Sequence, residues 1–113
     1  MWNRKVSKYG AKKITIDGIT FDSLKEGNRY QELKLLQRTG VITDLELQPK
    51  FLLQDKFKYN GKTERKIEYK ADFKYKENGK TVVEDVKGFK TDVYKLKRKL
   101  FLCKYNNIDF REV

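Results

Sequence analysis

Two acids and a lysine in one short stretch have the types and spacing for phosphodiester hydrolysis. The stretch "KADFKYKENGKTVVEDVKG" covers residues 70–88 and contains Asp72, Asp85 and Lys87. Side chains alternate between the two faces of a strand, so Asp85 and Lys87 point to the same side. The turn at Asn78-Gly79 folds the strand of Asp72 back toward Asp85. Two carboxylates are suitable ligands for a hard cation such as Mg²⁺ or Mn²⁺, and a lysine can position a water or stabilise developing charge.

The spacing of these three residues has a plainer interpretation, which stays open on this evidence. A lysine-rich chain often carries strand charges that face water and offset one another. The sequence contains no histidine. Imidazole metal ligands and serine-histidine or cysteine-histidine nucleophile pairs are therefore excluded. Any hydrolysis by this chain would depend on carboxylates, lysine, tyrosine and a hard cation.

The length and charge of the chain indicate one small domain with a polyanionic partner. The 113 residues fit a single domain with one core, and 27 Lys and Arg against 16 Asp and Glu give a net charge of +11. A field of this sign attracts nucleic acid. The only cysteine, Cys103, cannot form an internal disulfide, and no apolar run at the start has signal or transmembrane length. We therefore expect a cytoplasmic protein that does not contact membranes.

The pattern of turns and periodicity predicts a mixed α/β (α+β) fold in which helices flank a central mixed sheet. Residues 1–12 are basic and aperiodic and are interpreted as a flexible arm before a domain of residues 13–113. The first half of the domain should contain a hairpin over residues 13–21 and a helix over residues 22–40 with Ser23 as its N-cap. Several strands are expected to follow in an antiparallel meander with turns at Asn60-Gly61 and Asn78-Gly79.

A second helix is predicted over residues 91–105 and a closing strand over residues 107–113. In the first helix, Tyr30, Leu33 and Leu36 form an apolar stripe that Leu24 and Leu35 widen. In the second helix the predicted apolar face consists of Val93, Leu96, Leu100 and Cys103. Tyr94 and Phe101 are also expected in the core, and Cys103 is interpreted as a small buried side chain.

The combined order of these motifs resembles the catalytic core of the PD-(D/E)XK nuclease superfamily. Ala71-Asp72 matches the "PD" half, with Ala71 in place of the usual proline, and Asp85-Val86-Lys87 matches the "(D/E)XK" half. The acid often supplied by the preceding helix is matched by Glu26. The chain is further similar to small phage and prophage endonucleases and to the branches that cut transposon ends or resolve Holliday junctions. The resemblance runs from about residue 8 to residue 113.

The resemblance implies a restriction-endonuclease-like core and a divalent-metal-dependent DNA endonuclease in the cytoplasm of a bacterial host cell. It implies that Asp72 and Asp85 bind Mg²⁺ or Mn²⁺, together with the Val86 carbonyl and with Glu26, through water or directly. Lys87 would assist the nucleophile. The DNA could be branched and belong to recombination or replication, and two copies of the chain would form a homodimer. Cations on and before the second helix are candidate phosphate contacts: Lys90, Lys95, Lys97, Arg98 and Lys99.

A second interpretation stays open for three residues. A one-residue slip in register would turn Glu84 toward the site in place of Asp85, although Asp85 shares a face with Lys87. Glu26 also fits a capping box with Ser23, but the neighbouring Gly27 favours the metal role. Gln48 either borders the site or pairs in a strand edge. Two other functions also stay open for the whole chain: a basic nucleic-acid-binding protein without catalysis, and a phage protein that binds a host protein.

Overall fold

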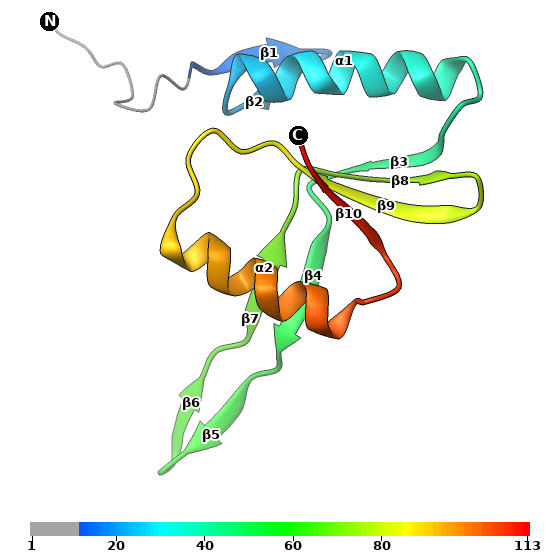
Figure 1. Ribbon diagram of the computed structural model, residues 1–113. Helices are drawn as coiled ribbons and strands as arrows, with labels where there is room; N and C mark the ends of the chain where they lie inside the picture. The colour runs from blue at the N-terminus through cyan, green and yellow to red at the C-terminus, as the bar shows by residue number, and fades with distance from the viewer. Residues whose placement is uncertain (1–11) are drawn as a thin grey trace, which may run out of the picture.

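Two helices and ten strands make up residues 12–113, the part of the chain that the computed structural model describes (Figure 1). The first half contains β1 (Ile14–Ile16), β2 (Ile19–Phe21), α1 (Leu24–Arg38), β3 (Thr43–Leu47), β4 (Lys50–Gln54) and β5 (Phe57–Tyr59). The second half contains β6 (Lys62–Glu64), β7 (Ile67–Lys70), β8 (Phe73–Glu77), β9 (Lys80–Asp85), α2 (Asp92–Lys104) and β10 (Asp109–Glu112). The predicted α+β class is confirmed.

The largest sheet is mixed and has the strand order β10-β9-β8-β3. β8 is antiparallel to both β3 and β9, whereas β10 returns parallel to β9 after α2. The parallel pair requires the crossover that α2 provides. The predicted closing strand is therefore confirmed, and it lies beside the strand that carries Asp85.

Three tight hairpins form where the sequence predicts them. Their first turn residues, Asp17, Asn60 and Asn78, have φ values of 54°, 51° and 53°, and each is followed by a glycine with positive φ. Two consecutive positive φ angles define the type I′ turn that matches the twist of paired strands. The Asn78-Gly79 turn fixes the pairing of β8 with β9.

The chain changes sheets at two neighbouring points. β3 and β8 pair in the large sheet, but their continuations β4 and β7 form a separate two-stranded sheet. At the crossing, the Gln48 N–H donates to the Asp72 carbonyl at 2.9 Å and the Ala71 N–H donates to the Pro49 carbonyl at 3.1 Å. A proline at position 71 could not make the second bond. Alanine at this position therefore contributes a backbone contact, and Asp72 lies at the bend.

The side chains form two hydrophobic clusters, where the sequence suggested a single core. One lies between α1 and the large sheet: Phe21, Tyr30, Leu33, Ile42, Phe73, Tyr75 and Val82. The other lies under α2: Phe51, Tyr69, Ala71, Val83, Tyr94 and Phe101. Val82 and Val83 are consecutive residues of β9 and enter different clusters, because strand side chains alternate. The two faces of β9 therefore point toward different helices.

α1 begins as predicted at Ser23, whose hydroxyl accepts the Glu26 N–H at 3.1 Å. Tyr30 and Leu33 are buried, but Leu24 and Leu35 are exposed, so the predicted widening of the stripe was wrong. Gly27 is needed because β1 packs directly on the helix: a Cβ there would lie 2.8 Å from Ile14 Cγ2. That contact explains the glycine without any metal.

The predicted apolar face of α2 was wrong. Val93, Leu96 and Leu100 are 63%, 61% and 44% exposed, and Cys103 is also exposed. The buried side is aromatic, as expected for Tyr94 and Phe101. The Phe101 ring lies 4.8 Å from the Phe51 ring and 5.0 Å from the Tyr69 ring. Large rings gain more from burial than the aliphatic side chains, and they determine which side of the helix faces the sheet.

The predicted basic arm of residues 1–12 lies outside the described residues except for Lys12. Within residues 12–113, neither helix has the length and apolar character needed to cross a membrane.

Candidate active site

Asp72 and Asp85 lie opposite each other where β8 begins and β9 ends. In the β8–β9 ladder Phe73 pairs with Glu84, and the next step places Asp72 beside Asp85. The Asp72 N–H also donates to the Glu84 carbonyl at 3.1 Å, which extends the pairing by one residue. Asp72 and Asp85, which are 13 residues apart in the sequence, are thus direct neighbours in the structure.

The Asp85 carboxylate is almost completely buried, at 1% exposure. Its Oδ2 accepts a hydrogen bond from the Tyr69 hydroxyl, and its Oδ1 lies 3.3 Å from Lys87 Nζ. Burial, followed by the bond to Asp85, raises the pKa of Tyr69, so this hydroxyl stays a donor. Within residues 12–113, Asp85 Oδ1 is buried without a hydrogen-bond partner. A buried carboxylate oxygen is costly unless a cation balances it, and here the Lys87 ammonium group lies close enough to do so.

The Asp72 carboxylate is held by the backbone beyond β9, where its Oδ2 accepts the Val86 N–H at 2.6 Å. Burial, followed by the negative charges of Asp85 and Glu26, raises the pKa of Asp72 to about 8. The Val86 N–H opposes this effect, since it stabilises the ionised form. The two aspartates therefore repel each other when both are charged, and a bound cation would relieve the repulsion.

Glu26 joins the two aspartates from the first turn of α1. It is 6% exposed, and its pKa is raised by burial and by the neighbouring charge of Asp22, with a smaller contribution from Asp85. Its carboxylate bonds to the backbone of Asp22, one residue before the Ser23 expected for a capping box. Ser23 supplies its own half of the box by accepting the Glu26 N–H. Glu26 thus sits both at the helix start and among the site acids.

Lys87 occupies the exit from β9 on the same side as Asp85. Its side chain is 30% exposed, and its Nζ lies 4.7 Å from the centre of the Tyr94 ring. The ring and the Asp85 carboxylate hold the ammonium group at the edge of the site. This lysine can contact both a carboxylate and an incoming anion.

Glu84 points away from these residues, toward α1. It is fully buried, and both of its oxygens are paired with Arg29, at 2.8 Å to Nε and 2.6 Å to Nη2. The Tyr75 hydroxyl donates to Glu84 as well. The structure therefore gives Glu84 a structural pairing and brings Asp85, not Glu84, beside Lys87.

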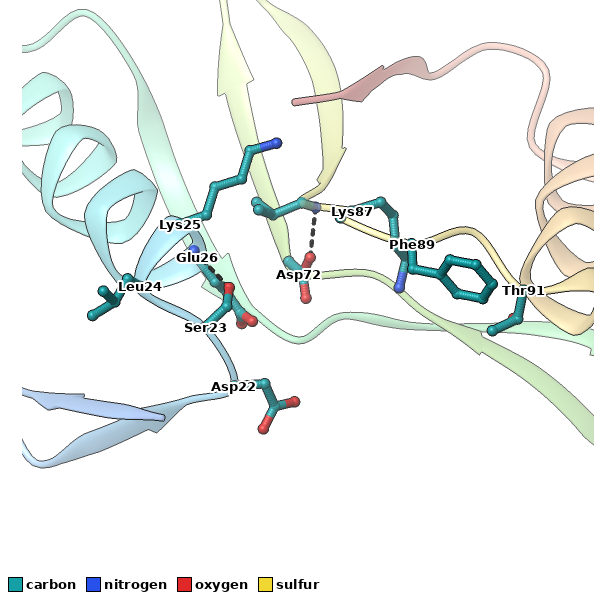
Figure 2. A pocket seen from close by; sticks show the side chains of 11 residues that line it. Asp22, Ser23, Leu24, Lys25, Glu26, Asp72, Lys87, Phe89 and Thr91 are labelled. Carbon is teal, nitrogen blue, oxygen red and sulfur yellow. Dashed lines mark hydrogen bonds between the residues drawn. The ribbon is translucent and has the colours of Figure 1, made fainter. Parts of the chain in front are cut away.

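A pocket of about 470 Å³ is lined by Glu26, Asp72 and Lys87, among others, and Figure 2 shows its lining. Asp85 is not among the residues that line it. Glu26 and Asp72 point their carboxylates into it, whereas the Lys25 amino group points away. Asp22 also lines the pocket and was missed by sequence reasoning, because an acid before an N-cap is ordinary. Tyr69, the partner of Asp85, was missed for a different reason: its alternation with Ala71 predicts only burial.

The remaining predicted residues lie around this pocket, not within it. Gln48 is exposed and reaches Asp72 only through its backbone N–H. Lys95 and Lys99 are exposed on α2, and Lys97 is partly buried. Lys90 and Arg98 are paired with Glu112 at 3.4 Å and 3.5 Å.

The residue types of the site suit a hard divalent cation, but within residues 12–113 no group of three or more Asp, Glu or Cys side chains is arranged so that it could hold a metal ion. The buried Asp85 carboxylate and the raised pKa values of Asp72 and Glu26 are the relevant observations. Oxygen ligands of this kind suit Mg²⁺ and Mn²⁺. Asp72, Asp85 and the Val86 carbonyl would hold the ion, and Glu26 would complete the set.

These features define an α+β protein with paired buried carboxylates and a lysine at one end of a mixed sheet. The chain belongs to the DUF1064 family, described as a protein of unknown function, whose model matches residues 6–113. No curated protein matches the chain.

Proposed function

We propose that the protein is a divalent-metal-dependent DNA endonuclease of the PD-(D/E)XK type. The observation that supports this most strongly is the position of Asp72 beside Asp85 on neighbouring strands, with Lys87 Nζ 3.3 Å from Asp85 Oδ1. Glu84, the preceding residue, is instead paired through both oxygens with Arg29 of α1. One oxygen of Asp85 accepts the Tyr69 hydroxyl, and the other is paired with Lys87.

Each residue of the site has a distinct task in the proposed reaction. Asp72 and Asp85 bind the ion, Tyr69 fixes the orientation of Asp85, and Glu26 adds a third acid from α1. When bound, the ion supplies Lewis-acid activation of the phosphate and lowers the pKa of a water. Lys87 positions that water or stabilises the charge that develops on the phosphate oxygens.

Both helices begin at the pocket, which favours an anionic substrate there. Ser23 caps α1 and Thr91 caps α2, and both residues line the pocket. The N-terminal ends of helices carry partial positive charge and favour phosphate groups. Lys95 and Lys99, exposed on α2, extend this positive surface away from the site and are the best placed of the predicted phosphate contacts.

The test is cleavage of labelled single-stranded, duplex, flap and four-way-junction DNA with Mg²⁺, Mn²⁺ or EDTA. Asp85→Asn and Lys87→Ala should abolish metal-dependent cutting while DNA binding persists. Glu46→Gln and Lys76→Ala make similar charge changes on exposed positions of the same sheet and should leave cutting unchanged. The panel also shows whether branched DNA is preferred.

Three results would overturn the proposal. Cutting that survives Asp85→Asn would mean that a contaminating nuclease or another site is responsible. Salt-sensitive DNA binding with no cutting under either metal would indicate a nucleic-acid-binding protein without catalysis. A protein that retains a host protein and ignores DNA would belong to the interaction class.

We further propose that two copies pair through the exposed face of α2. Val93, Leu96, Leu100 and Cys103 follow one another at intervals of three, four and three residues, the spacing of helices that pair with one another. A second copy of α2 presents the same apolar stripe, so the surface is complementary to itself. Leu96→Lys should therefore give a monomer in sedimentation velocity, whereas Leu35→Lys, on the exposed side of α1, should not. A monomeric wild-type chain at high concentration would contradict the pairing.

A further inference from the structure

The β5–β6 hairpin is an arm that extends beyond the rest of the molecule. Figure 1 shows it continuing the β4–β7 pair, which crosses α2, to the bottom of the view. Every residue from 54 to 67 is exposed, on both faces of the ribbon. An isolated two-stranded hairpin is only marginally stable in water, so its length has no evident value for the stability of the fold.

The arm carries two exposed aromatic rings on one face. Phe57 is 47% exposed and Tyr59 is 66% exposed. Phe57 lies opposite Glu64 and Tyr59 opposite Lys62, which places these four side chains on the same face. Within residues 12–113 no other ring packs on Phe57 or Tyr59. Exposed rings of this kind indicate a binding surface more often than a structural one.

The charge of the arm favours a polyanion. Residues 54–67 contain Lys56, Lys58, Lys62, Arg65 and Lys66 against Asp55 and Glu64, a net charge of 5 − 2 = +3. Lys66 is 3.4 Å from Glu68, but in the described chain no acid pairs with Lys58, Lys62 or Arg65. Rings interleaved with unpaired cations are the pattern by which proteins hold unpaired nucleotides, with bases on the rings and phosphates on the lysines.

The spacing of the rings matches one base. Residues two apart on a strand are separated by about 6.7 Å, and a flat base between two rings needs about 3.4 Å on each side. We therefore propose that Phe57 and Tyr59 stack on unpaired bases, so that the preferred nucleic acid contains single strand next to the cutting point. This inference rests on the proposed DNA substrate.

The length of β7 and the arm sets where the unpaired bases lie. Glu64, opposite Phe57, is eight residues before Asp72, and Lys62, opposite Tyr59, is ten residues before it. At about 3.3 Å per residue, the rings lie no further than about 26 and 33 Å from Asp72 along the strand. That reach corresponds to at most about ten nucleotides. The substrate class is thus DNA with unpaired bases within about ten nucleotides of the cut phosphate.

The experiment measures binding in EDTA, so that it does not depend on cutting. Fluorescent single-stranded, blunt-duplex and tailed-duplex DNA are titrated with the wild-type chain and with Phe57→Leu/Tyr59→Leu, which keeps apolar side chains but removes the rings. We expect this variant to bind single-stranded and tailed DNA at least about fivefold more weakly and blunt duplex almost as well. Quenching of 2-aminopurine placed in the tail should also be lost.

A second pair of variants tests whether DNA binding depends on where the lysines lie or only on the net charge of the chain. Lys58→Gln/Lys62→Gln should weaken binding of all three DNAs more than Lys76→Gln/Lys80→Gln, which removes two exposed charges elsewhere. Circular dichroism checks that each variant folds. If folded Phe57→Leu/Tyr59→Leu binds tailed DNA as tightly as wild type, the stacking role of the arm is refuted. The proposed DNA substrate is not affected by that result. A wild-type chain that binds none of the DNAs would overturn both the arm and the proposed function.

Discussion

Tyr69 and Tyr75 form a matched pair of tyrosines, each donating its hydroxyl to one of two consecutive acids. Tyr69 donates to Asp85, which is also paired with Lys87, and Tyr75 donates to Glu84, which Arg29 also holds with two hydrogen bonds. Tyr69→Phe therefore removes the hydroxyl that donates to Asp85 Oδ2. Tyr75→Phe leaves Glu84 with its arginine. The two variants lose the same atom but should differ in metal binding.

The expected magnitudes follow from these contacts. A hydrogen bond to a charged group is worth about 1.5–3 kcal/mol, so Tyr69→Phe should lower the melting temperature by roughly 6–12 °C for a chain of this size. Tyr75→Phe should cost less, since Glu84 keeps its main partner. Loss of a residue that orients a ligand typically weakens metal binding about 10- to 100-fold. Tyr69→Phe should show this loss, and Tyr75→Phe should bind metal like the wild type.

The assay combines thermal unfolding with calorimetric titration of Mn²⁺ and Mg²⁺ at a pH near 8. Equal metal affinities for wild type, Tyr69→Phe and Tyr75→Phe would refute the orienting role of Tyr69. Equal losses in both variants would also refute it, because the effect would then be a general loosening of β9. Only a loss confined to Tyr69→Phe supports the site as described.

Three other outcomes follow from the structure. Gly27→Ala should destabilise the fold by about 1–3 kcal/mol in urea, despite the better helix propensity of alanine, because its Cβ would lie 2.8 Å from Ile14; a gain in stability would contradict this packing. Burial raises the pKa of Asp72 from 3.8 to about 8, so its contribution to stability is present below pH 4 and is lost as pH rises to 8. Between pH 5 and pH 8 the urea midpoint should therefore fall more for wild type than for Asp72→Asn, and a divalent cation should reduce that fall. Equal falls in the two proteins would contradict the raised pKa of Asp72. Arg29→Met should cost about 3–5 kcal/mol by leaving Glu84 buried without its partner, and Arg29→Met/Glu84→Gln should recover part of that loss in the same assay.

The local parts of the fold and the central pair of the site could be predicted from the sequence. Turn chemistry at Asn78-Gly79 requires two positive φ angles, and these determine the register of β8 on β9. Once that register is fixed, Asp72 must lie beside Asp85. Ser23 could likewise be identified as a cap from its own position. In each case the deciding interaction is close in the chain.

Features that depend on distant contacts could not be predicted. The aliphatic periodicity of α2 favoured burial of Val93 and Leu96, but the site that receives the helix contains the rings of Phe51 and Tyr69, and Tyr94 and Phe101 fill it. Nothing near α2 in the sequence shows what it will pack against. The bend at Asp72 could not be predicted either, because it depends on backbone hydrogen bonds to Gln48 and Pro49, which lie far away in the sequence.

The ion pair between Arg29 and Glu84 shows how an acid outside the pocket can still determine its geometry. Arg29 lies 55 residues before Glu84 in the chain and three residues after Glu26 on α1. Glu84 immediately precedes Asp85 on β9, so this pair ties the first turns of α1 to the end of β9. Glu26 is thereby held over Asp72 while Asp85, on the other face of the strand, stays with Tyr69 and Lys87. Because consecutive strand residues face opposite sides, one acid can anchor the helix while the next is left for the proposed metal site.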